Sequence, residues 1–262
     1  MGRKIVVTSG KGGVGKTTIV AGIARALASI NCTVCVVDAD IGLNNLDLVM
    51  NIENKVVYDL VDCMQGKCRI KQAIIKDAIL DTLYTLPAGK NLPINMVVSF
   101  GEIVNKLASI FDFVIIDSPA GLDEGFKRAV SSATEAIVVV TPHISSVRDA
   151  SKVLTVLSSA TNILASNIVV NRIRGDLVAG GEMMSHTDIC TLLNESCLGV
   201  TPESDAYNVS SSLNFVCNSK EILNKAFVIM AKNIVDGSNL QLDYTSKYTG
   251  VIGYFRRKLK GL

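Results

Sequence analysis

Short apolar runs alternate along the chain with segments that have helical periodicity. Five runs are rich in β-branched residues and almost continuously apolar, as expected of buried parallel strands. They are KIVVTS, TVCVVDAD, FDFVIID, AIVVVT and NIVVN. The segments that we expect to be helical are 17–29, 100–110, 145–160 and 219–236. Repeated strand–helix–strand units predict a doubly wound, mainly parallel α/β sheet, with ligands at the carboxyl ends of its strands.

The composition fits one large globular domain followed by a different C-terminus. Of the 262 residues, 48% are apolar, which is enough for a well-filled core. We expect residues 1–236 to form this domain. Residues 237–249 are polar and turn-rich, so they are interpreted as a linker to a tail formed by residues 250–262.

The formal charge of +2 is unevenly distributed between this tail and the rest of the chain. The tail carries four basic residues and no acid: Arg256, Arg257, Lys258 and Lys260. Without them the remaining chain has a formal charge of −2, and this leaves no overall basic excess to suggest nucleic acid as a partner. A local basic patch stays open as an alternative.

The number and distribution of the cysteines indicate a reduced intracellular compartment. There are 7 scattered cysteines, an odd number, and no signal peptide precedes them. Cys32 and Cys35 form a C-x-x-C within a predicted strand, where side chains three apart point to opposite faces. We therefore favour core thiols over a metal or redox site there. No apolar run is long enough for a membrane-spanning helix.

The stretch SGKGGVGKTT, residues 9–18, lies directly between a predicted strand and a predicted helix. Gly10, Gly15, Lys16 and Thr17 match the phosphate-binding pattern G-x-x-x-x-G-K-[ST]. Glycines let backbone N–H groups surround phosphate oxygens, and the helix N-terminus adds partial positive charge. Lys16 is expected to contact the β- and γ-phosphates of ATP, and the Thr17 hydroxyl to ligate Mg²⁺. The predicted cradle comprises Gly10, Lys11, Gly12, Gly13, Val14, Gly15, Lys16, Thr17 and Thr18.

A second lysine, Lys11, makes this motif more specific. The run KGGVGKTT resembles the deviant Walker A motif of the MinD/ParA ATPases. The resemblance implies that Lys11 reaches across a dimer interface to the phosphates of the partner's nucleotide. A cation there would neutralise charge between two ATP-loaded subunits, so we expect an ATP-dependent homodimer. A solvated loop lysine is the alternative.

Aspartates follow two further predicted strands, in VVDADIGLNNLD and FVIIDSPAGLD. By resemblance, Asp40 would orient the attacking water, Asp38 would assist the metal or water network, and Asn45 would lie in a switch region. Asp117 resembles the Walker B acid that holds Mg²⁺ through water, with a helix cap as the alternative role. No histidine or other strong base is present in these stretches, so slow ATP hydrolysis is expected.

Two other segments resemble the nucleotide-base site of the same family. In VVNR, Asn171 would hydrogen-bond the adenine ring and Arg172 would stack on it or close over it. Pro202 and Glu203 match the PE of a loop that flanks the base. The preference for ATP over GTP rests on this resemblance and not on spacing.

The tail GVIGYFRRKLKGL, residues 250–262, has the pattern of a basic amphipathic helix that lies in a lipid interface. The residues expected to contact anionic lipid are Val251, Ile252, Phe255, Arg256, Arg257, Lys258, Leu259 and Lys260. One copy should bind weakly, whereas two copies on an ATP-bound dimer would act together. The alternative is a surface helix docked on its own domain.

The string SSVRD resembles the helix by which the cell-division branch of the family meets its activator, and this implies contacts by Arg148 and Asp149. The implied function is a membrane-cycling ATPase that positions the division site. It would recruit a MinC-like inhibitor, be reset by a MinE-like activator, and work in the cytoplasm on the inner face of the cell membrane or the equivalent plastid compartment.

Three alternatives belong to the same superfamily. A ParA-like DNA partition ATPase would be expected to carry a basic face on its main domain. An iron–sulfur carrier would be expected to carry a C-x-x-C in its C-terminal half, whereas the one here begins at Cys32. A flagellar-number regulator shares the amphipathic tail and is harder to exclude.

Overall fold

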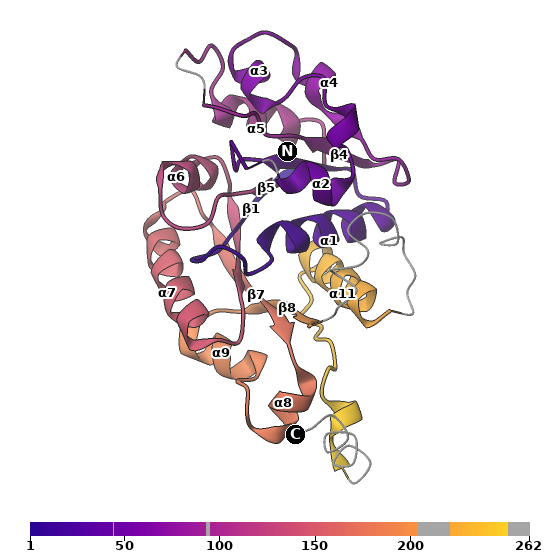
Figure 1. The fold of residues 1–262 in the computed structure, drawn as a ribbon, viewed down its shortest axis with the longest axis vertical. Coiled ribbons are helices and arrows are strands. Elements are labelled where there is room, and N and C mark those ends of the chain that lie inside the picture. Colours follow the sequence, from indigo (N-terminus) through magenta and orange to yellow (C-terminus); the bar gives the residue numbers. More distant parts are fainter. Residues whose placement is uncertain (44, 93–94, 204–220, 251–262) are drawn as a thin grey trace.

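The computed structural model describes residues 1–43, 45–92, 95–203 and 221–250, and its strands form one sheet in the order β3-β4-β2-β5-β1-β6-β7-β8 (Figure 1). Every neighbouring pair is parallel except β3 with β4. The strands are β1 Arg3–Thr8, β2 Val34–Asp38, β3 Ile75–Lys76, β4 Leu83–Leu86, β5 Phe113–Asp117, β6 Glu135–Val140, β7 Ala165–Ile173 and β8 Cys197–Pro202. The predicted doubly wound, mainly parallel sheet is confirmed.

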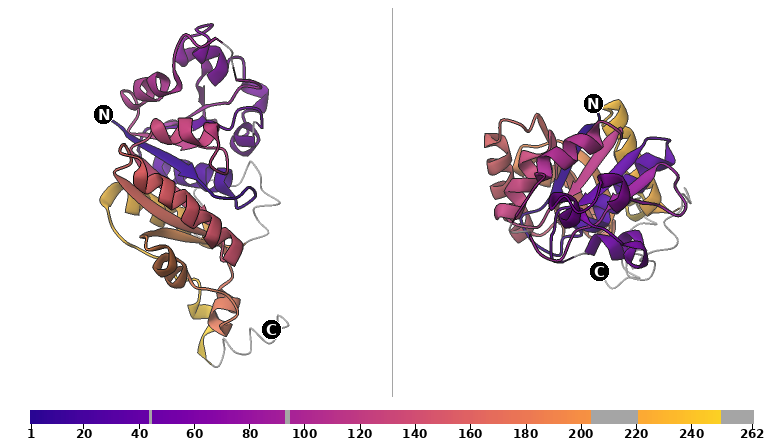
Figure 2. Two further views of the ribbon diagram at one scale, coloured as in Figure 1. Left: turned by 90° about the vertical axis from the view of Figure 1, so that its left-hand side faces the viewer. Right: turned by 90° about the horizontal axis from the view of Figure 1, so that it is seen from above.

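Helices cover both faces of this sheet (Figures 1 and 2). The α-helices are α1 Lys16–Ser29, α2 Asn45–Met50, α3 Leu60–Met64, α4 Ile70–Ala73, α5 Phe100–Ala108, α6 Glu124–Ser131, α7 Ile144–Ser159, α8 Gly175–Gly180, α9 His186–Leu193 and α11 Ile222–Asp236. Two single turns of 3₁₀-helix are η1 Glu53–Lys55 and η2 Ser246–Tyr248. The four predicted helical segments correspond to α1, α5, α7 and α11, although residues 219–220 of the last prediction lie outside the described residues.

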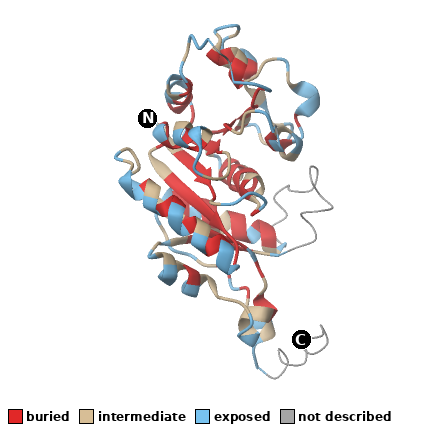
Figure 3. Ribbon diagram, turned by 60° about the vertical axis from the view of Figure 1, so that its left-hand side comes forward, coloured by how far each residue is buried: buried red, intermediate tan, exposed pale blue. Residues whose placement is uncertain are grey.

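Alternate residues of each central strand point into two different cores. Val6 of β1 packs with the layer that includes α5, α6 and α7. Its neighbours Ile5 and Val7 pack with the layer that includes α1 and α11. All residues of β2 and β5 are buried, as the colours of Figure 3 show for the middle of the sheet. Burial on both faces explains why these strands are continuous apolar runs.

Three strands and several helices were not predicted from the sequence. β3 has only 2 residues, and β8 contains Gly199 and Pro202, which are both depleted in strands. The unpredicted helices have 4 to 8 residues, too few to display a repeated apolar period. These short helices depend on tertiary packing, so the sequence pattern alone does not indicate them.

The segment 237–249, interpreted as a linker, packs against the main domain over part of its length. Leu242 and Tyr244 are buried. The Gln241 side chain donates a hydrogen bond to the carbonyl oxygen of Cys197, and the Tyr244 hydroxyl lies 2.8 Å from Nδ1 of His186. This segment therefore has a defined course on the body. Its role as a linker and the domain boundary at residue 236 stay predictions. Residues 251–262 of the predicted tail lie outside the described part of the chain.

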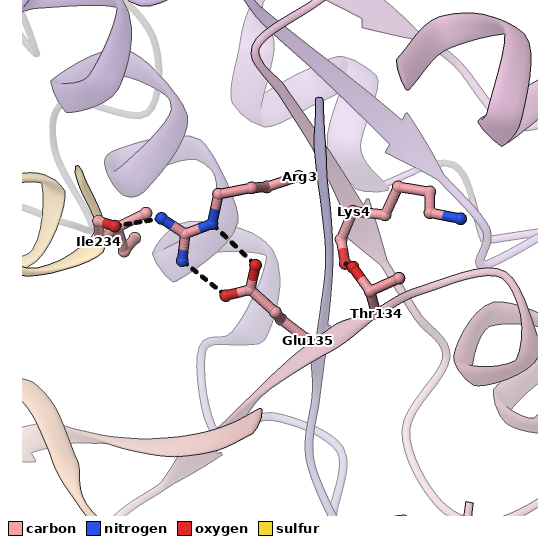
Figure 4. Close-up of polar contacts among 5 residues, drawn as sticks. All are labelled: Arg3, Lys4, Thr134, Glu135 and Ile234. Atoms are coloured by element: carbon pink, nitrogen blue, oxygen red, sulfur yellow. Dashed lines mark hydrogen bonds and ion pairs between the residues drawn. The ribbon is translucent and has the colours of Figure 1, made fainter. Parts of the chain in front are cut away.

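Arg3 ties together three elements at the amino ends of the strands (Figure 4). Its Nε and Nη2 atoms lie 2.7 and 2.6 Å from the carboxylate oxygens of Glu135 on β6. Its Nη1 atom donates to the carbonyl oxygen of Ile234 on α11. Hydrogen bonding with Glu135 raises the pKa of the Arg3 guanidinium. The loops that carry the candidate site lie at the opposite edge of the sheet, where the parallel strands have their carboxyl ends.

Candidate active site

The glycine loop connects the end of β1 to the start of α1. Gly15 has φ 90° and immediately precedes α1, in the left-handed region that favours glycine. A Cβ atom at Gly15 would lie 2.3 Å from Nδ2 of Asn171, so a side chain is excluded there. At Gly12 and Gly13, by contrast, a Cβ atom would meet nothing within 4 Å. The loop is packed on its inner side and open on its outer side, as a phosphate cradle requires.

Lys16 and Asp117 form a buried ion pair beneath this loop. Nζ of Lys16 lies 2.9 Å from Oδ1 of Asp117, and the side chains are 9% and 2% exposed. Lys16 is the first residue of α1, and Asp117 is the last residue of β5, which pairs with β1. The fold therefore brings together the phosphate-binding lysine and the Walker B-like acid that the sequence predicted.

Asp38 and Asp40 complete an acidic cluster beside this pair. Asp38 is the register partner of Asp117 on the neighbouring strand, and its carboxylate accepts a hydrogen bond of 2.9 Å from the Asp40 amide. Burial, reinforced by the charge of Asp117, raises the pKa of Asp38 to about 8. Burial also raises the pKa of Asp40, while the charge of Lys16 opposes that shift.

This donor set suits Mg²⁺. The Thr17 hydroxyl and the carboxylates of Asp38 and Asp117 are oxygen donors, which hard cations prefer. Among the described residues, no group of three His, Cys, Asp or Glu side chains could hold a metal ion by itself. An incomplete protein shell is typical of Mg²⁺ sites at which substrate phosphates supply further ligands.

Asn171 joins the glycine loop to β7 and β8. Its Nδ2 atom donates to the carbonyl oxygen of Val14 (2.7 Å), and its Oδ1 atom accepts from the Thr201 hydroxyl (2.6 Å) and the Arg172 amide (2.9 Å). The side chain is buried. We predicted that Asn171 binds the adenine ring, but three of its four hydrogen-bonding positions are taken within the protein. One N–H is left for that role.

The exposed neighbour Arg172 has φ 60°, an uncommon value for a residue other than glycine. It lines a hollow of about 430 Å³ together with Lys11, Gly12, Gly13 and Val14 of the glycine loop. The same hollow is lined by Thr141, His143, Ser145, Ser146, Arg174, Leu177, Met183 and Glu203. Pro202 lines an adjoining hollow that shares Arg174 and Glu203. The structure thus brings the second lysine of the motif and the predicted base-reading segment to one place.

Sequence reasoning missed three residues of this region: His143, Arg174 and Thr201. His143 follows the carboxyl end of β6, so the rule that ligands bind at that edge could have identified it. Thr201 belongs to β8, which had no recognisable pattern. For Arg174 we find no sequence signal.

Backbone hydrogen bonds connect the loop after β5 to the glycine loop, and the end of β2 to the end of β5. The Gly121 amide donates to the carbonyl oxygen of Ser9 (3.1 Å), and the Ala39 amide donates to that of Asp117 (2.9 Å). Asn45, predicted to lie in the first switch, is exposed at the start of α2. The loop after β5 is therefore a direct neighbour of the glycine loop, whereas the segment after β2 is linked to it only through the end of β5.

The predicted partner residues lie on α7, beside the start of the glycine loop. Arg148 is exposed, and Asp149 forms an ion pair of 3.0 Å with Lys152. A Cβ atom at Gly10 would lie 2.4 Å from the backbone carbon and oxygen of Asp149. The backbone of α7 therefore packs directly against the loop.

Comparison with known proteins identifies the family. Residues 5–214 match the CobQ/CobB/MinD/ParA nucleotide binding domain family. The chain is 47% identical over 208 residues to the septum site-determining protein MinD of Bacillus subtilis, an alignment that covers 78% of each protein.

Two solved structures are also similar. One is the MinC:MinD cell division protein complex of Aquifex aeolicus, with a TM-score of 0.82 and 35% identity over 91% of this chain and 97% of that one. The other is the MinD of Pyrococcus horikoshii complexed with Mg-ADP, with a TM-score of 0.77 and 28% identity over 90% and 96% of the two chains. The chain therefore belongs to the MinD branch of the CobQ/CobB/MinD/ParA nucleotide-binding family.

Proposed function

We propose that this chain is an ATPase that dimerises with ATP, binds the membrane as a dimer and positions the division site by recruiting a division inhibitor. The observation that carries the ATPase part is the buried pair of Lys16 and Asp117 beneath an open glycine loop. Family membership supports the nucleotide chemistry. The names of the Bacillus subtilis and Aquifex aeolicus relatives support the role in division.

The cofactors are ATP and Mg²⁺, a choice supported by the Mg-ADP complex of the Pyrococcus horikoshii relative. Backbone N–H groups of residues 12–15 and the ammonium group of Lys16 would bind phosphate oxygens. Thr17, Asp38 and Asp117 would hold the metal directly or through water. Bound Mg²⁺ would neutralise the charge that develops on the phosphates.

Asp40 would orient the attacking water. It lies just beyond β2, and its amide is fixed by the hydrogen bond to Asp38. Because burial raises its pKa, Asp40 is a better proton acceptor than an ordinary surface aspartate. With positioning as the main contribution, hydrolysis would be slow until a partner completes the site.

The exposed Lys11 would reach a second subunit. It lies on the open side of the glycine loop, in the hollow that also contains Arg172. A cation at this position can approach phosphates held by another copy of the chain, which would make dimerisation depend on ATP.

A MinE-like activator would act through α7. The exposed Arg148 offers a contact on this helix. Because the backbone of Asp149 packs against Gly10, a partner that shifts α7 would also shift the phosphate cradle. For a MinC-like inhibitor, the support is the Aquifex aeolicus complex.

Membrane binding would depend on the basic amphipathic tail, whose predicted lipid-contacting residues Val251 to Lys260 lie outside the described part. Within the described ranges, no helix has the length and apolar character needed to cross a bilayer. The basic amphipathic pattern of the tail supports a location on the inner face of the cell membrane, or in the equivalent plastid compartment, as a peripheral dimer.

The test is sedimentation of the purified chain with anionic phosphatidylglycerol vesicles, with either ATP or ADP present. We expect binding with ATP and little with ADP. A matched truncation that lacks residues 250–262 should stay in solution with both nucleotides while it still binds ATP. Binding that is equal with both nucleotides, or that survives the truncation, would contradict the proposal.

The same assay with calf-thymus DNA as a competitor separates the division role from DNA partition. A membrane-cycling protein should keep its ATP-dependent binding to vesicles in the presence of DNA. If ATP instead drives the chain onto DNA and away from the vesicles, the partition function is favoured.

A further inference from the structure

Two cysteines outside the nucleotide site lie in contact with each other. The Sγ atoms of Cys63 and Cys68 are 3.5 Å apart. Cys63 is on α3 and is 3% exposed, whereas Cys68 follows the helix and is half-buried. A disulfide bond is about 2.05 Å long, so the two sulfur atoms need to approach by only about 1.5 Å.

The fold fixes the backbone between these thiols. Gly66 has φ 71° and ends α3. Its amide donates to the carbonyl oxygen of Cys63 (3.1 Å), and the Lys67 amide donates to that of Asp62 (3.0 Å). This pair of hydrogen bonds is a Schellman motif. At the other end, Asp59 and Asp62 form a capping box. A short helix capped at both ends thus holds Cys68 next to Cys63.

The two thiols differ in access. Gly66, Lys67 and Arg69 around Cys68 are exposed, so a small reagent reaches Cys68 before Cys63. Burial raises the pKa of both thiols. Cys68 is therefore the thiol that meets a small reagent first, and Cys63, 3.5 Å away, is placed to react with it afterwards.

We propose that Cys63 and Cys68 form a peroxide-sensitive dithiol that closes reversibly to an intramolecular disulfide. The Cys68 thiolate attacks one oxygen of hydrogen peroxide, the O–O bond breaks, and the departing hydroxide takes up the thiol proton as water. The Cys63 sulfur then attacks the sulfenic acid on Cys68, and the S–O bond breaks. A second water leaves with the Cys63 proton. Two thiols are oxidised and one peroxide is reduced to two waters.

This inference does not depend on the ATPase proposal, because neither sulfur belongs to the nucleotide site. The proposal is also specific to this pair and does not claim that every cysteine of the chain is sensitive to peroxide. The thiols of Cys190 and Cys197 share a hydrogen bond as well, but they lie on α9 and β8, two separate elements of the packed body. Cys63 and Cys68 belong to one turn, so a bond between them closes a loop of only a few residues and does not link separate elements.

The experiment uses the full chain with Cys190→Ser and Cys197→Ser, treated with hydrogen peroxide, alkylated and digested with trypsin. Trypsin cleaves after Lys67, so a bond between Cys63 and Cys68 joins two peptides that otherwise separate. We expect this joined species, with the mass of two hydrogen atoms lost, and its disappearance with dithiothreitol. The further variant Cys68→Ser should give no joined species and an alkylated Cys63.

Three results would overturn the proposal. The first is that both cysteines remain open to alkylation after peroxide treatment. The second is that Cys68 accumulates as sulfinic acid without a joined peptide. The third is that the urea-unfolded chain forms the bridge as fast as the folded chain, since the folded turn would then contribute nothing. Phenylarsine oxide, which requires two neighbouring thiols, supplies an independent measurement. The folded chain should bind it through Cys63 and Cys68, and the Cys68→Ser variant should not.

Discussion

Nζ of Lys16 lies 2.9 Å from Oδ1 of Asp117, and the two side chains are almost completely shielded from water. The pair joins the first residue of α1 to the last residue of β5, so it connects the glycine loop to the centre of the sheet. Removing one partner from such a pair leaves an uncompensated charge in a medium of low polarity. Asp117 should therefore matter for stability as well as for Mg²⁺.

We expect Asp117→Ala to lower the free energy of unfolding by about 3 kcal/mol, because it leaves the ammonium group of Lys16 buried without its partner. The measurement is urea denaturation without nucleotide or Mg²⁺. Asp81→Ala is the control, since Asp81 pairs with Lys76 on the surface and its loss should have no measurable effect. Equal stabilities of the two variants would show that the buried pair contributes nothing.

Asp38→Asn should change how stability depends on pH. The pKa of Asp38 rises from 3.8 to about 8 on folding, because burial and the charge of Asp117 disfavour its carboxylate. Between these values the unfolded chain releases a proton that the folded chain retains. This carboxyl therefore costs up to about 1.4 kcal/mol of stability for each pH unit of increase.

The asparagine variant keeps the oxygen that accepts from the Asp40 amide and does not titrate. In thermal melts without Mg²⁺, the melting temperature of the variant should exceed that of the wild type near pH 8, and the difference should shrink toward pH 5. A difference that stays constant over this range would mean that Asp38 has an ordinary pKa.

Asn171→Ala should loosen the glycine loop. The change leaves the Val14 carbonyl and the Thr201 hydroxyl without their partner, for which we expect a loss of about 2 kcal/mol in stability and weaker ATP binding. Isothermal calorimetry measures the binding. Asn167→Ala, a half-buried position on the same strand, serves as the control. If both variants bind ATP equally well, the contact with Val14 does not position the loop.

Local patterns predicted the strands and the loop but not the contacts that connect them. β1, β2, β5, β6 and β7 could be recognised because each has at least four consecutive residues buried on both faces, which makes them apolar runs. The glycine loop could be recognised because its residues are contiguous. The bond from Asn171 to Val14 spans 157 positions, and no periodicity in either segment indicates it.

The protonation state of Asp38 could not be predicted from the sequence either. Asp38 looks like any aspartate after a strand. Its pKa is raised first by burial and then by the charge of Asp117, which the pairing of β2 with β5 places beside it. Likewise, Tyr244 lies in a polar segment, yet it is buried and in contact with His186. Such properties arise from tertiary structure, so they become visible only in three dimensions.

Asp40→Ala should slow ATP hydrolysis and leave dimerisation intact. Asp40 is proposed to orient the attacking water, whereas binding depends on Lys16 and the glycine loop. We expect a fall in turnover of roughly a hundredfold, the scale of a lost positioning contact. Phosphate release measured with vesicles present tests this. Asp47→Ala, on α2, is the matched control. If the turnover of the Asp40 variant is unchanged, another group must orient the attacking water.

Lys11→Ala tests the dimer. In a two-fold dimer each Lys11 would make one charge-assisted contact to the partner's nucleotide, worth about 1.5–3 kcal/mol. Because symmetry removes both contacts at once, the dissociation constant should rise by roughly 100-fold or more. Sedimentation velocity with a non-hydrolysable ATP analogue measures this change, and binding of the nucleotide by the monomer should persist since Lys16 is untouched.

The control for Lys11 is Lys71→Ala, which removes an exposed charge on α4, outside the glycine loop. It separates a specific contact from a general change in net charge. If both variants dimerise like the wild type, Lys11 is a solvated loop residue and the ATP dependence of any dimer needs another source. If neither variant dimerises, association depends on overall charge. Raising the salt concentration should then change the dimerisation of both variants to the same extent. Only loss of the dimer in Lys11→Ala alone supports a contact across the interface.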